Sequence, residues 1–322
     1  MMEKLLEVRG LKKTFTIRSG IFRKTTGYVN AVDSVDLDVF PDETLGLVGE
    51  SGCGKTTLAK IILALEKPDA GRVIFDGVDI HEARGQSLTH IRRGIQVIFQ
   101  DPFGSLNPRK RISSIVTEPM IIHKVGSKSQ RYERAVELMN LVGLSPDMLG
   151  RYPHEFSGGQ RQRICIARAL AVNPRLLLCD EPVSALDVSI QAQVINLLVK
   201  LQSELSLSYI FISHDLSVVG YISHRIAVMY RGQIVELADS AALFESPLHP
   251  YTRCLMDAVP EPVPGKEKGS VRSGWENSGD TPSPHGCSFS SGCPHKEDRC
   301  LKEKPSLVEK KPRHWVACHM HQ

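Results

Sequence analysis

The segment GESGCGKTT, residues 49–57, constrains the fold of this chain most, because it joins an apolar strand-like run to a helix-like run. Its spacing fits G-x-x-x-x-G-K-[ST], whose glycines let successive backbone N–H groups face phosphate oxygens. We expect Lys55 to reach the β- and γ-phosphates of a nucleotide, Thr56 to ligate Mg²⁺ and Thr57 to lie near the α-phosphate. The motif alone leaves kinase, GTPase and ATPase open. The predicted phosphate-binding residues are Gly49, Glu50, Ser51, Gly52, Cys53, Gly54, Lys55, Thr56 and Thr57.

Four short apolar runs predict strands of one parallel sheet, because Leu, Ile and Val occupy both faces of each run. The segment between the last two runs, residues 187–205, carries apolar side chains at helical spacing. This alternation of strand, helix and strand predicts an α/β fold with right-handed crossovers. The predicted strands are residues 44–49, 95–99, 175–179 and 209–213.

An antiparallel β subdomain and a helical insertion complete the predicted core. Residues 72–80 and 226–237 are typical of hairpins, since each has a glycine-containing turn at its centre. Residues from about 101 to 165 predict a mostly helical subdomain, in which the helix over 131–144 ends near Gly143. The predicted turn pairs are Asp76-Gly77 and Arg231-Gly232.

Polar side chains follow three of the predicted strands. Asp180 and Glu181 end the run LLLCDE, and Gln100 and His214 each end another run. Ligands of open α/β sheets bind at the carboxyl edge of the strands, so we expect these side chains to face the γ-phosphate. Asp180 would hold Mg²⁺ together with Thr56 and Gln100, Glu181 would orient or deprotonate the attacking water, and His214 would hydrogen-bond the γ-phosphate. No Asn-Lys-x-Asp motif occurs, which disfavours a GTPase.

The composition fits a soluble globular protein, with 41% apolar and 24% charged residues among 322. A net charge of +4 is too small to argue for a nucleic-acid partner. No run of 18 apolar residues predicts a membrane span, and the N-terminus lacks the apolar region of a signal peptide. We therefore expect a cytoplasmic protein with reduced thiols.

Four of the eight cysteines crowd near the C-terminus, after a Pro-, Gly- and Ser-rich segment over 260–284 that predicts a linker. Their spacing, C-x5-C-x6-C-x17-C, differs from the paired C-x2-C of a common zinc ribbon. Four thiolates can hold zinc or a [4Fe–4S] cluster, and nearby histidines can replace thiolates around zinc. The candidate ligands are Cys287, Cys293, Cys300 and Cys318, with His295, His314, His319 and His321 as alternatives.

The segment FSGGQRQR, residues 156–163, predicts a second anion-binding turn, because a Ser-Gly-Gly turn opens a helix-like run. The chain has the catalytic parts of only one nucleotide site. In combination with the phosphate loop, the polar strand ends and SALD at 184–187, this segment makes residues 5–250 resemble the ATP-binding-cassette (ABC) ATPases. The one departure is Phe156, where that family more often has Leu.

The resemblance implies the cofactors ATP and Mg²⁺ and explains the second turn. In ABC ATPases this turn closes over ATP held by a second, homologous or identical ATPase subunit, so one chain carries half of each of two sites. The resemblance further implies that adenine stacks on Phe15, or on Tyr28 as the alternative. Asp187 would lie at the interface between the two subunits. The residues expected to contact the partner's ATP are Ser157, Gly158, Gly159 and Gln160.

The C-terminal part narrows the resemblance. Residues 245–262 and the four-cysteine segment are similar to the ATPases of oligopeptide, dipeptide and nickel importers. This implies a peripheral protein at the cytoplasmic face of the membrane, with two permease subunits and an extracytoplasmic solute-binding protein as partners. It also favours iron–sulfur over zinc. We expect a nucleotide-binding domain over 1–259 and a Cys-rich extension over 260–322.

Peptide is the expected solute, and nickel remains the alternative because similar ATPases serve both. A second class of function is a soluble ABC machine in translation or repair, which usually has two cassettes in one chain. A degenerate regulatory subunit is disfavoured, because Lys55, Asp180, Glu181 and His214 are all present.

Overall fold

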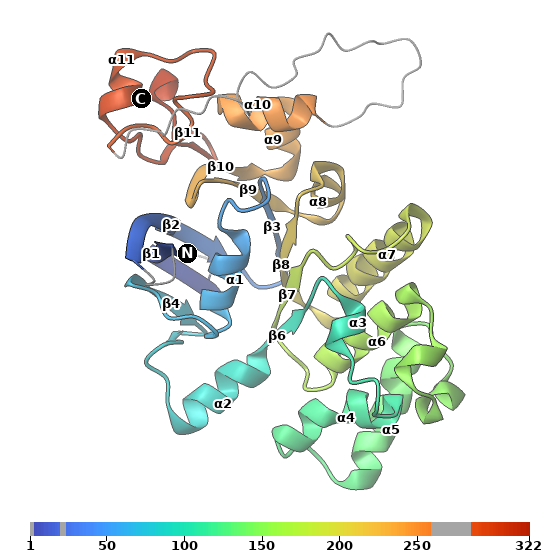
Figure 1. Cartoon of the computed structure of the whole chain (residues 1–322). Helices are drawn as coiled ribbons and strands as arrows, with labels where there is room; N and C mark the ends of the chain where they lie inside the picture. The colour runs from blue at the N-terminus through green and yellow to red at the C-terminus, as the bar shows by residue number, and fades with distance from the viewer. Residues whose placement is uncertain (1–2, 20–23, 259–284) are drawn as a thin grey trace, which may run out of the picture.

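The computed structural model describes residues 3–19, 24–258 and 285–322 of the chain. Figure 1 shows a central sheet with an antiparallel sheet on one side and a group of helices on the other. The C-terminal residues lie beyond the edge of the central sheet that carries β10. The expected linker over 260–284 lies outside the described residues.

The central sheet has the strand order β11-β12-β10-β9-β3-β8-β7-β6. Its middle is parallel, because β3 pairs with β8 and β9, and β7 pairs with β8 and β6, in the same direction. The parallel sheet and its expected strands are thus confirmed, with ends that differ by one residue. The strands are β3 (Thr44–Val48), β6 (Ile95–Ile98), β7 (Leu176–Asp180), β8 (Ser208–Ser213) and β9 (Arg225–Tyr230).

Helices pack on this sheet through apolar stripes, so two buried cores lie against it. The helix α7 (Val188–Leu205) matches the expected helix over 187–205, and its buried face includes Val194, Leu198 and Leu201. These positions are separated by three or four residues, which places them on one face of a helix. The other helices nearby are α1 (Lys55–Ile62), α2 (Gly85–Gly94) and α8 (Leu216–Ile222).

The antiparallel sheet has the order β2-β1-β4-β5. Its expected hairpin turn at Asp76-Gly77 is confirmed, because both residues have positive φ, 52° and 76°. Consecutive positive φ values match the right-handed twist of a two-residue hairpin. The strands are β1 (Leu6–Ser19), β2 (Lys24–Val39), β4 (Ala70–Phe75) and β5 (Val78–Asp79).

The insertion between β6 and β7 is helical, as expected. It extends further than the expected limit of about 165, because its last helix continues to Leu170. Gly143 follows the helix α5 with φ 72°, a conformation that glycine adopts readily at a helix end. The elements are α3 (Pro102–Ser105), α4 (Ile112–Ile122), α5 (Lys128–Leu141), η1 (Pro146–Gly150), η2 (Pro153–Glu155) and α6 (Gly158–Leu170).

The C-terminal residues join the central sheet. The second expected hairpin is confirmed, since β10 (Gln233–Asp239) follows β9 after the turn Arg231-Gly232. On its other edge β10 pairs with β12 (His314–Val316), which in turn pairs with β11 (Val308–Lys311). The remaining elements are α9 (Ser240–Glu245), α10 (Pro250–Asp257), α11 (Asp298–Lys302) and η3 (His319–His321).

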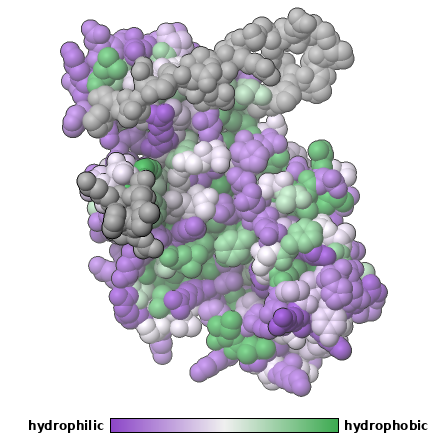
Figure 2. Space-filling view, in the orientation of Figure 1, coloured by the Kyte–Doolittle hydropathy of each residue, from purple (hydrophilic) through white to green (hydrophobic). Residues whose placement is uncertain are grey.

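Figure 2 shows hydrophilic residues over much of one face, with hydrophobic residues in separate patches. Within the described ranges, no helix combines the length and the apolar character that a membrane span requires.

Candidate functional site: a nucleotide pocket at the strand ends

The phosphate loop follows β3, all five of whose residues are buried, and leads into α1. Gly54 has a φ of 115°, and a Cβ atom there would lie 2.0 Å from the Ala31 carbonyl oxygen. A side chain at this position would both strain the backbone and clash with it. The loop therefore depends on glycine for its shape, as the motif predicts.

Lys55 lies across the inside of this loop. Its side chain is buried, and its Nζ atom donates to the carbonyl oxygens of Gly49 at 2.6 Å and Glu50 at 2.8 Å. The ammonium also lies 3.6 Å from the Cys53 sulfur. Burial raises the pKa of the Cys53 thiol, although Lys55 opposes the shift. The positive charge of Lys55 therefore lies within the loop that the sequence predicts to bind phosphate.

Three residues that follow neighbouring strands meet at the carboxyl edge of the sheet. The Gln100 amide nitrogen donates to Glu181 Oε2 at 3.1 Å, and His214 Nδ1 lies 3.3 Å from the same oxygen. Glu181 has a φ of 47°, a left-handed conformation that is uncommon for a residue with a side chain and is enriched at functional sites. The parallel order β6-β7-β8 explains the meeting, because it brings the three strand ends together.

Asp180 is the last residue of β7 and lies beside Glu181. Burial raises the pKa of its carboxyl group, the neighbouring Glu181 raises it further, and Lys55 lowers it. A carboxylate that is crowded in this way is stabilised by a cation, and Mg²⁺ prefers oxygen ligands. Asp180 and the Thr56 hydroxyl offer such oxygens, so the residues present fit a magnesium ion.

The Ser-Gly-Gly turn caps α6 in the helical part of the molecule. Ser157 Oγ accepts from the Gln160 backbone N–H at 3.4 Å, and Gln160 Oε1 accepts from the Ser157 N–H at 3.0 Å. A Cβ on Gly159 would lie 2.4 Å from Ile190 Cγ2, so α6 and α7 approach closely there. Phe156 is buried and anchors the turn. Figure 1 shows α6 away from α1, the helix of the phosphate loop.

The remaining expected contacts lie at exposed positions. Asp187 precedes α7 as its N-cap residue and is exposed. Phe15 is 41% exposed on β1, where it pairs with Val29, whereas Tyr28 is 70% exposed and pairs with Thr16. Directly paired residues share a face and successive residues alternate, so the Phe15 and Tyr28 rings lie on opposite faces of the ribbon. Only one of them can face a given adenine.

Comparison with known proteins decides the family. The ABC transporter family matches residues 32–184, and the family described as the oligopeptide/dipeptide transporter C-terminal region matches residues 235–300. The oligopeptide transport ATP-binding protein AppF of Bacillus subtilis is 50% identical over 325 residues, covering 99% of this chain and 98% of that protein. This chain belongs to the ABC transporter ATP-binding proteins. It is an ATPase.

Further relatives of the ABC ATPase agree. The glutathione import ATP-binding protein GsiA of Pectobacterium atrosepticum is 52% identical over 83% of this chain, which spans only 43% of that longer protein. A dimeric structure of the ATP-binding cassette MJ0796 with bound ADP and Pi is 31% identical, covers 73% of this chain and 98% of that one, and superposes with a TM-score of 0.64. The cbiO1 protein of Clostridium perfringens, at 24% identity and a TM-score of 0.65, shares the fold.

The four C-terminal cysteines of the ABC ATPase line one cavity. The cavity has a volume of about 10 Å³ and is also lined by His249, His295 and His319. Burial raises the pKa of Cys287 to about 11 and also raises the pKa of Cys293 and Cys318. Four irons and four sulfides need far more space than about one water-sized sphere. Across residues 3–19, 24–258 and 285–322, no three His, Cys, Asp or Glu side chains are arranged to hold a metal ion.

Tyr251 of the ABC ATPase is a contact of the phosphate loop that the sequence interpretation missed. Its hydroxyl accepts from the Glu50 backbone N–H at 3.1 Å, and its ring lies 4.5 Å from that of Tyr230 and 5.5 Å from that of Phe289. Tyr251 therefore connects the loop to the cysteine cavity, which Phe289 lines. Its segment, 245–262, carries only a family resemblance in the sequence, since no local pattern places a tyrosine against a loop two hundred residues away.

Proposed function

We propose that this chain is the ATP-hydrolysing subunit of an importer that moves di- or oligopeptides across the cytoplasmic membrane. The observation that carries the proposal is the end-to-end likeness to AppF, which includes the C-terminal region typical of oligopeptide and dipeptide transporters. GsiA, named for glutathione import, favours the same class of solute, because glutathione is itself a small peptide. Nickel is the alternative cargo, and a soluble machine in translation or repair is a weaker one.

In the proposed chemistry the loop residues bind the phosphates of ATP, and residues at the strand ends position and activate the attacking water. Lys55 would exchange its loop carbonyl partners for phosphate oxygens, while Thr56, Asp180 and Gln100 would hold Mg²⁺. Bound Mg²⁺ supplies charge neutralisation at the β- and γ-phosphates. Glu181 would orient or deprotonate the attacking water, and His214 would hydrogen-bond the γ-phosphate. The contacts of Gln100 and His214 with the Glu181 carboxylate support this division of roles.

The second half of each pocket would come from another ATPase subunit, identical or homologous. The turn Ser157–Gln160 lies in the helical part and is capped by its own hydrogen bonds, so its free end is available to a neighbouring molecule. Asp187 begins α7 beside it and would lie in the interface. The dimeric cassette MJ0796 is a solved assembly of a similar chain.

Two permease subunits would contact the helical part, with a solute-binding protein on the far side of the membrane. A groove of about 590 Å³ supports this, because it is lined by Phe99, Ser105 and Pro119 together with Arg168 of α6. Phe99 is 41% exposed and precedes Gln100 directly. A permease helix in this groove would sense the position of Gln100. The chain would then lie peripherally at the cytoplasmic face.

The proposed domains are a nucleotide-binding domain over 1–259 and a Cys-rich extension over 260–322. The helical subdomain, expected at about 101–165, continues to Leu170. Four thiols around one cavity support a structural role for the extension, but the cavity is too small for a [4Fe–4S] cluster. A single zinc ion remains the smaller alternative, and binding it would require the raised thiol pKa values to be overcome by proton release. Metal analysis of anaerobically purified protein distinguishes these states.

Uptake by cells tests the proposed cargo. A strain that lacks the gene should lose uptake of labelled dipeptide and regain it with the intact chain, but not with Glu181→Gln. Uptake of Ni²⁺ should be unchanged throughout. Loss of Ni²⁺ uptake with normal dipeptide uptake would replace peptide by nickel as the cargo, and unchanged uptake of both would contradict an importer of this class.

A further inference from the structure

A cavity of about 870 Å³ lies outside the nucleotide pocket. It is bounded by the antiparallel sheet, by the residues that precede β3 and β9, and by the C-terminal strand β12. The phosphate loop follows the carboxyl end of β3, which runs parallel to β9. The cavity is lined by residues that precede these two strands, so it lies at the opposite end of the sheet. Its size is within the range of small-molecule sites, which often form where parts of a protein meet.

One wall of the cavity is apolar and aromatic. Phe40 and Trp315 line it together with Leu237 and Leu307. Leu237 is buried, whereas Phe40, Leu307 and Trp315 are partly exposed, so they have surface left for a ligand. These four side chains come from four separate segments, two of which belong to the C-terminal residues that pair with β10.

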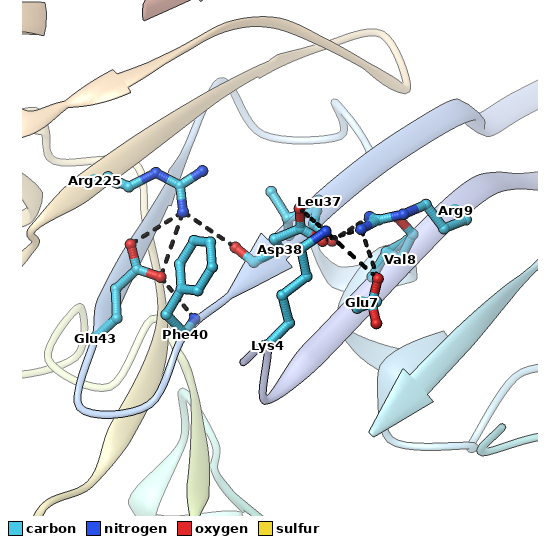
Figure 3. Close-up of polar contacts among 9 residues, drawn as sticks. All are labelled: Lys4, Glu7, Val8, Arg9, Leu37, Asp38, Phe40, Glu43 and Arg225. Atoms are coloured by element: carbon cyan, nitrogen blue, oxygen red, sulfur yellow. Dashed lines mark hydrogen bonds and ion pairs between the residues drawn. The ribbon is translucent and has the colours of Figure 1, made fainter. Parts of the chain in front are cut away.

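Ion pairs form another part of the cavity lining, and Figure 3 shows them. Lys4 Nζ lies 3.1 Å from Asp38, and Arg9 contacts both Glu7, at 2.8 Å, and Asp38. Lys4, Arg9 and Asp38 all line the cavity. The pairs hold each other in place, so these side chains are preorganised and do not need a ligand to order them.

Arg225 uses only one of its three side-chain nitrogens as a donor to other described residues. Its Nη1 atom donates to Glu43 at 3.1 Å and to the Asp38 carbonyl oxygen at 3.4 Å, and its guanidinium lies 5.5 Å from the Phe40 ring centre (Figure 3). The Arg225 side chain is 6% exposed. Among the described residues, Nε and Nη2 of Arg225 have no hydrogen-bond partner. These two nitrogens form the fork that binds a carboxylate with two parallel hydrogen bonds.

Acidic groups at the cavity match a positive charge on the same ligand. The Asp42 carboxylate is exposed and has no ion pair or hydrogen bond to another described residue. Asp36 accepts from the Gly10 backbone N–H through one oxygen only. Four cationic and four carboxylate side chains line the cavity, so their formal charges cancel. Such a lining disfavours polyphosphates and polycations, and it favours a ligand that carries one charge of each sign.

We propose that this cavity binds short peptides in their free, zwitterionic form. The peptide carboxylate pairs with the open fork of Arg225, its ammonium faces Asp42 and Asp36, and its apolar side chains lie against Phe40 and Trp315. The identity of the ligand rests on the proposed function, since the importer would raise the concentration of such peptides next to this surface. The site would let the ATPase bind the solute that has already entered.

Fluorescence of Trp315 tests the proposal in the isolated full-length chain. The chain has two tryptophans, so Trp275→Phe leaves Trp315 as the only one. Titration with leucyl-leucine should change its fluorescence and reach saturation. The same dipeptide with an acetylated N-terminus and an amidated C-terminus lacks both charges and should bind at least about ten-fold more weakly.

Two variants locate the site. Arg225→Lys keeps the charge beside Glu43 but removes the fork, and it should weaken leucyl-leucine binding about ten-fold. Leu307→Phe fills a partly exposed position of the apolar wall and should weaken binding by a similar factor without touching an ion pair. Leu301→Phe, at an exposed position of α11 outside the cavity lining, is the matched control and should bind as the parent does.

Absence of a saturable change, equal binding of the capped dipeptide, or unaltered binding in Leu307→Phe would each overturn the proposal. The titration uses no permease and no transport. If peptide uptake fails but leucyl-leucine binds saturably, only the assignment of the cargo is wrong. If peptide uptake is normal but leucyl-leucine does not bind, only the proposed site is wrong.

Discussion

At the scale of the residue, the proposed chemistry of this ATPase depends on side chains that project from neighbouring strand ends. Glu181 Oε2 contacts both Gln100 and His214. Lys55 donates hydrogen bonds to carbonyl oxygens of its own loop. The sequence singles out these four as candidates, because each directly follows an apolar run or completes a glycine loop. It does not predict their mutual distances, since these depend on the order in which the strands pair.

Glu181→Gln should lower the ATP turnover rate at least about 100-fold, because an amide cannot accept the proton of the attacking water. ATP binding should be retained, since glutamine preserves the size of the side chain. Turnover and nucleotide binding are measured on the same preparation, with Glu245→Gln at an exposed position of α9 as the control. Turnover near that of the control would mean that another group handles the water.

Asp76→Asn should reduce the acid sensitivity of the fold. The ion pair with Arg175, at 2.7 Å, lowers the Asp76 pKa from 3.8, so the pair stabilises the protein above pH 3.8 and is lost as the pH falls through the folded-state pKa. Asn tolerates the left-handed conformation at this turn, so the fold should form.

The effect is measured as the difference in urea midpoint between about pH 6 and about pH 3. It should be smaller in Asp76→Asn than in the parent, by the equivalent of about 1 kcal/mol or less, because the pair is partly exposed. Asp257→Asn, which lacks an ion pair among the described residues, is the control. Equal pH dependence in Asp76→Asn and the parent would show that the pair is not stabilising.

At the scale of the element, strand β12 fastens the C-terminal residues to the ATPase core. Glu236 of β10 is fully buried and accepts from the backbone N–H groups of Leu248, at 2.7 Å, and His249, at 2.9 Å. Its other contact is His314 Nε2 of β12, at 2.7 Å. One carboxylate thus connects two sheet strands with the start of α10.

The sequence did not predict this connection. Residues 285–322 show little apolar periodicity, so the sequence does not predict β11 and β12. These strands form because β10 has an edge that β9 does not pair with, and β12 pairs there. Local pattern predicted the elements whose burial is nearly complete, such as β3 and β7. It could not predict pairing between segments that are far apart in the chain.

Glu236→Gln should lower the free energy of unfolding by about 1–3 kcal/mol, because an amide leaves a buried partner without its acceptor. Cleavage of the C-terminal residues by a protease should also be faster. Glu309→Gln on the exposed β11 is the matched control. Unchanged stability and cleavage would show that Glu236 does not fasten this segment.

Tyr251→Phe tests whether α10 orders the phosphate loop. Loss of one hydrogen bond to the Glu50 N–H, worth about 1 kcal/mol, should raise the KM for ATP about five-fold. Tyr230→Phe is the control, because Tyr230 packs in the same aromatic cluster and its hydroxyl has no hydrogen-bond partner among the described residues. Equal KM values in the two variants would mean that the contact is not used.

At the scale of the whole molecule, the ATPase has the two turns that we propose to bind phosphate in separate parts. The phosphate loop opens α1 beside the antiparallel sheet, and the Ser157 turn opens α6 in the helical part (Figure 1). If both turns bind the same nucleotide, one chain alone does not close a complete pocket around it. In the proposed assembly a second ATPase subunit completes it, so hydrolysis and pairing become one event.

The most direct measurement is the ATP turnover rate per chain as the protein is diluted, with the oligomeric state followed by sedimentation in the same buffer. The account predicts that the rate per chain falls together with the fraction of paired molecules and disappears when the chain is monomeric. A monomeric preparation that hydrolyses ATP at an undiminished rate per chain would contradict it.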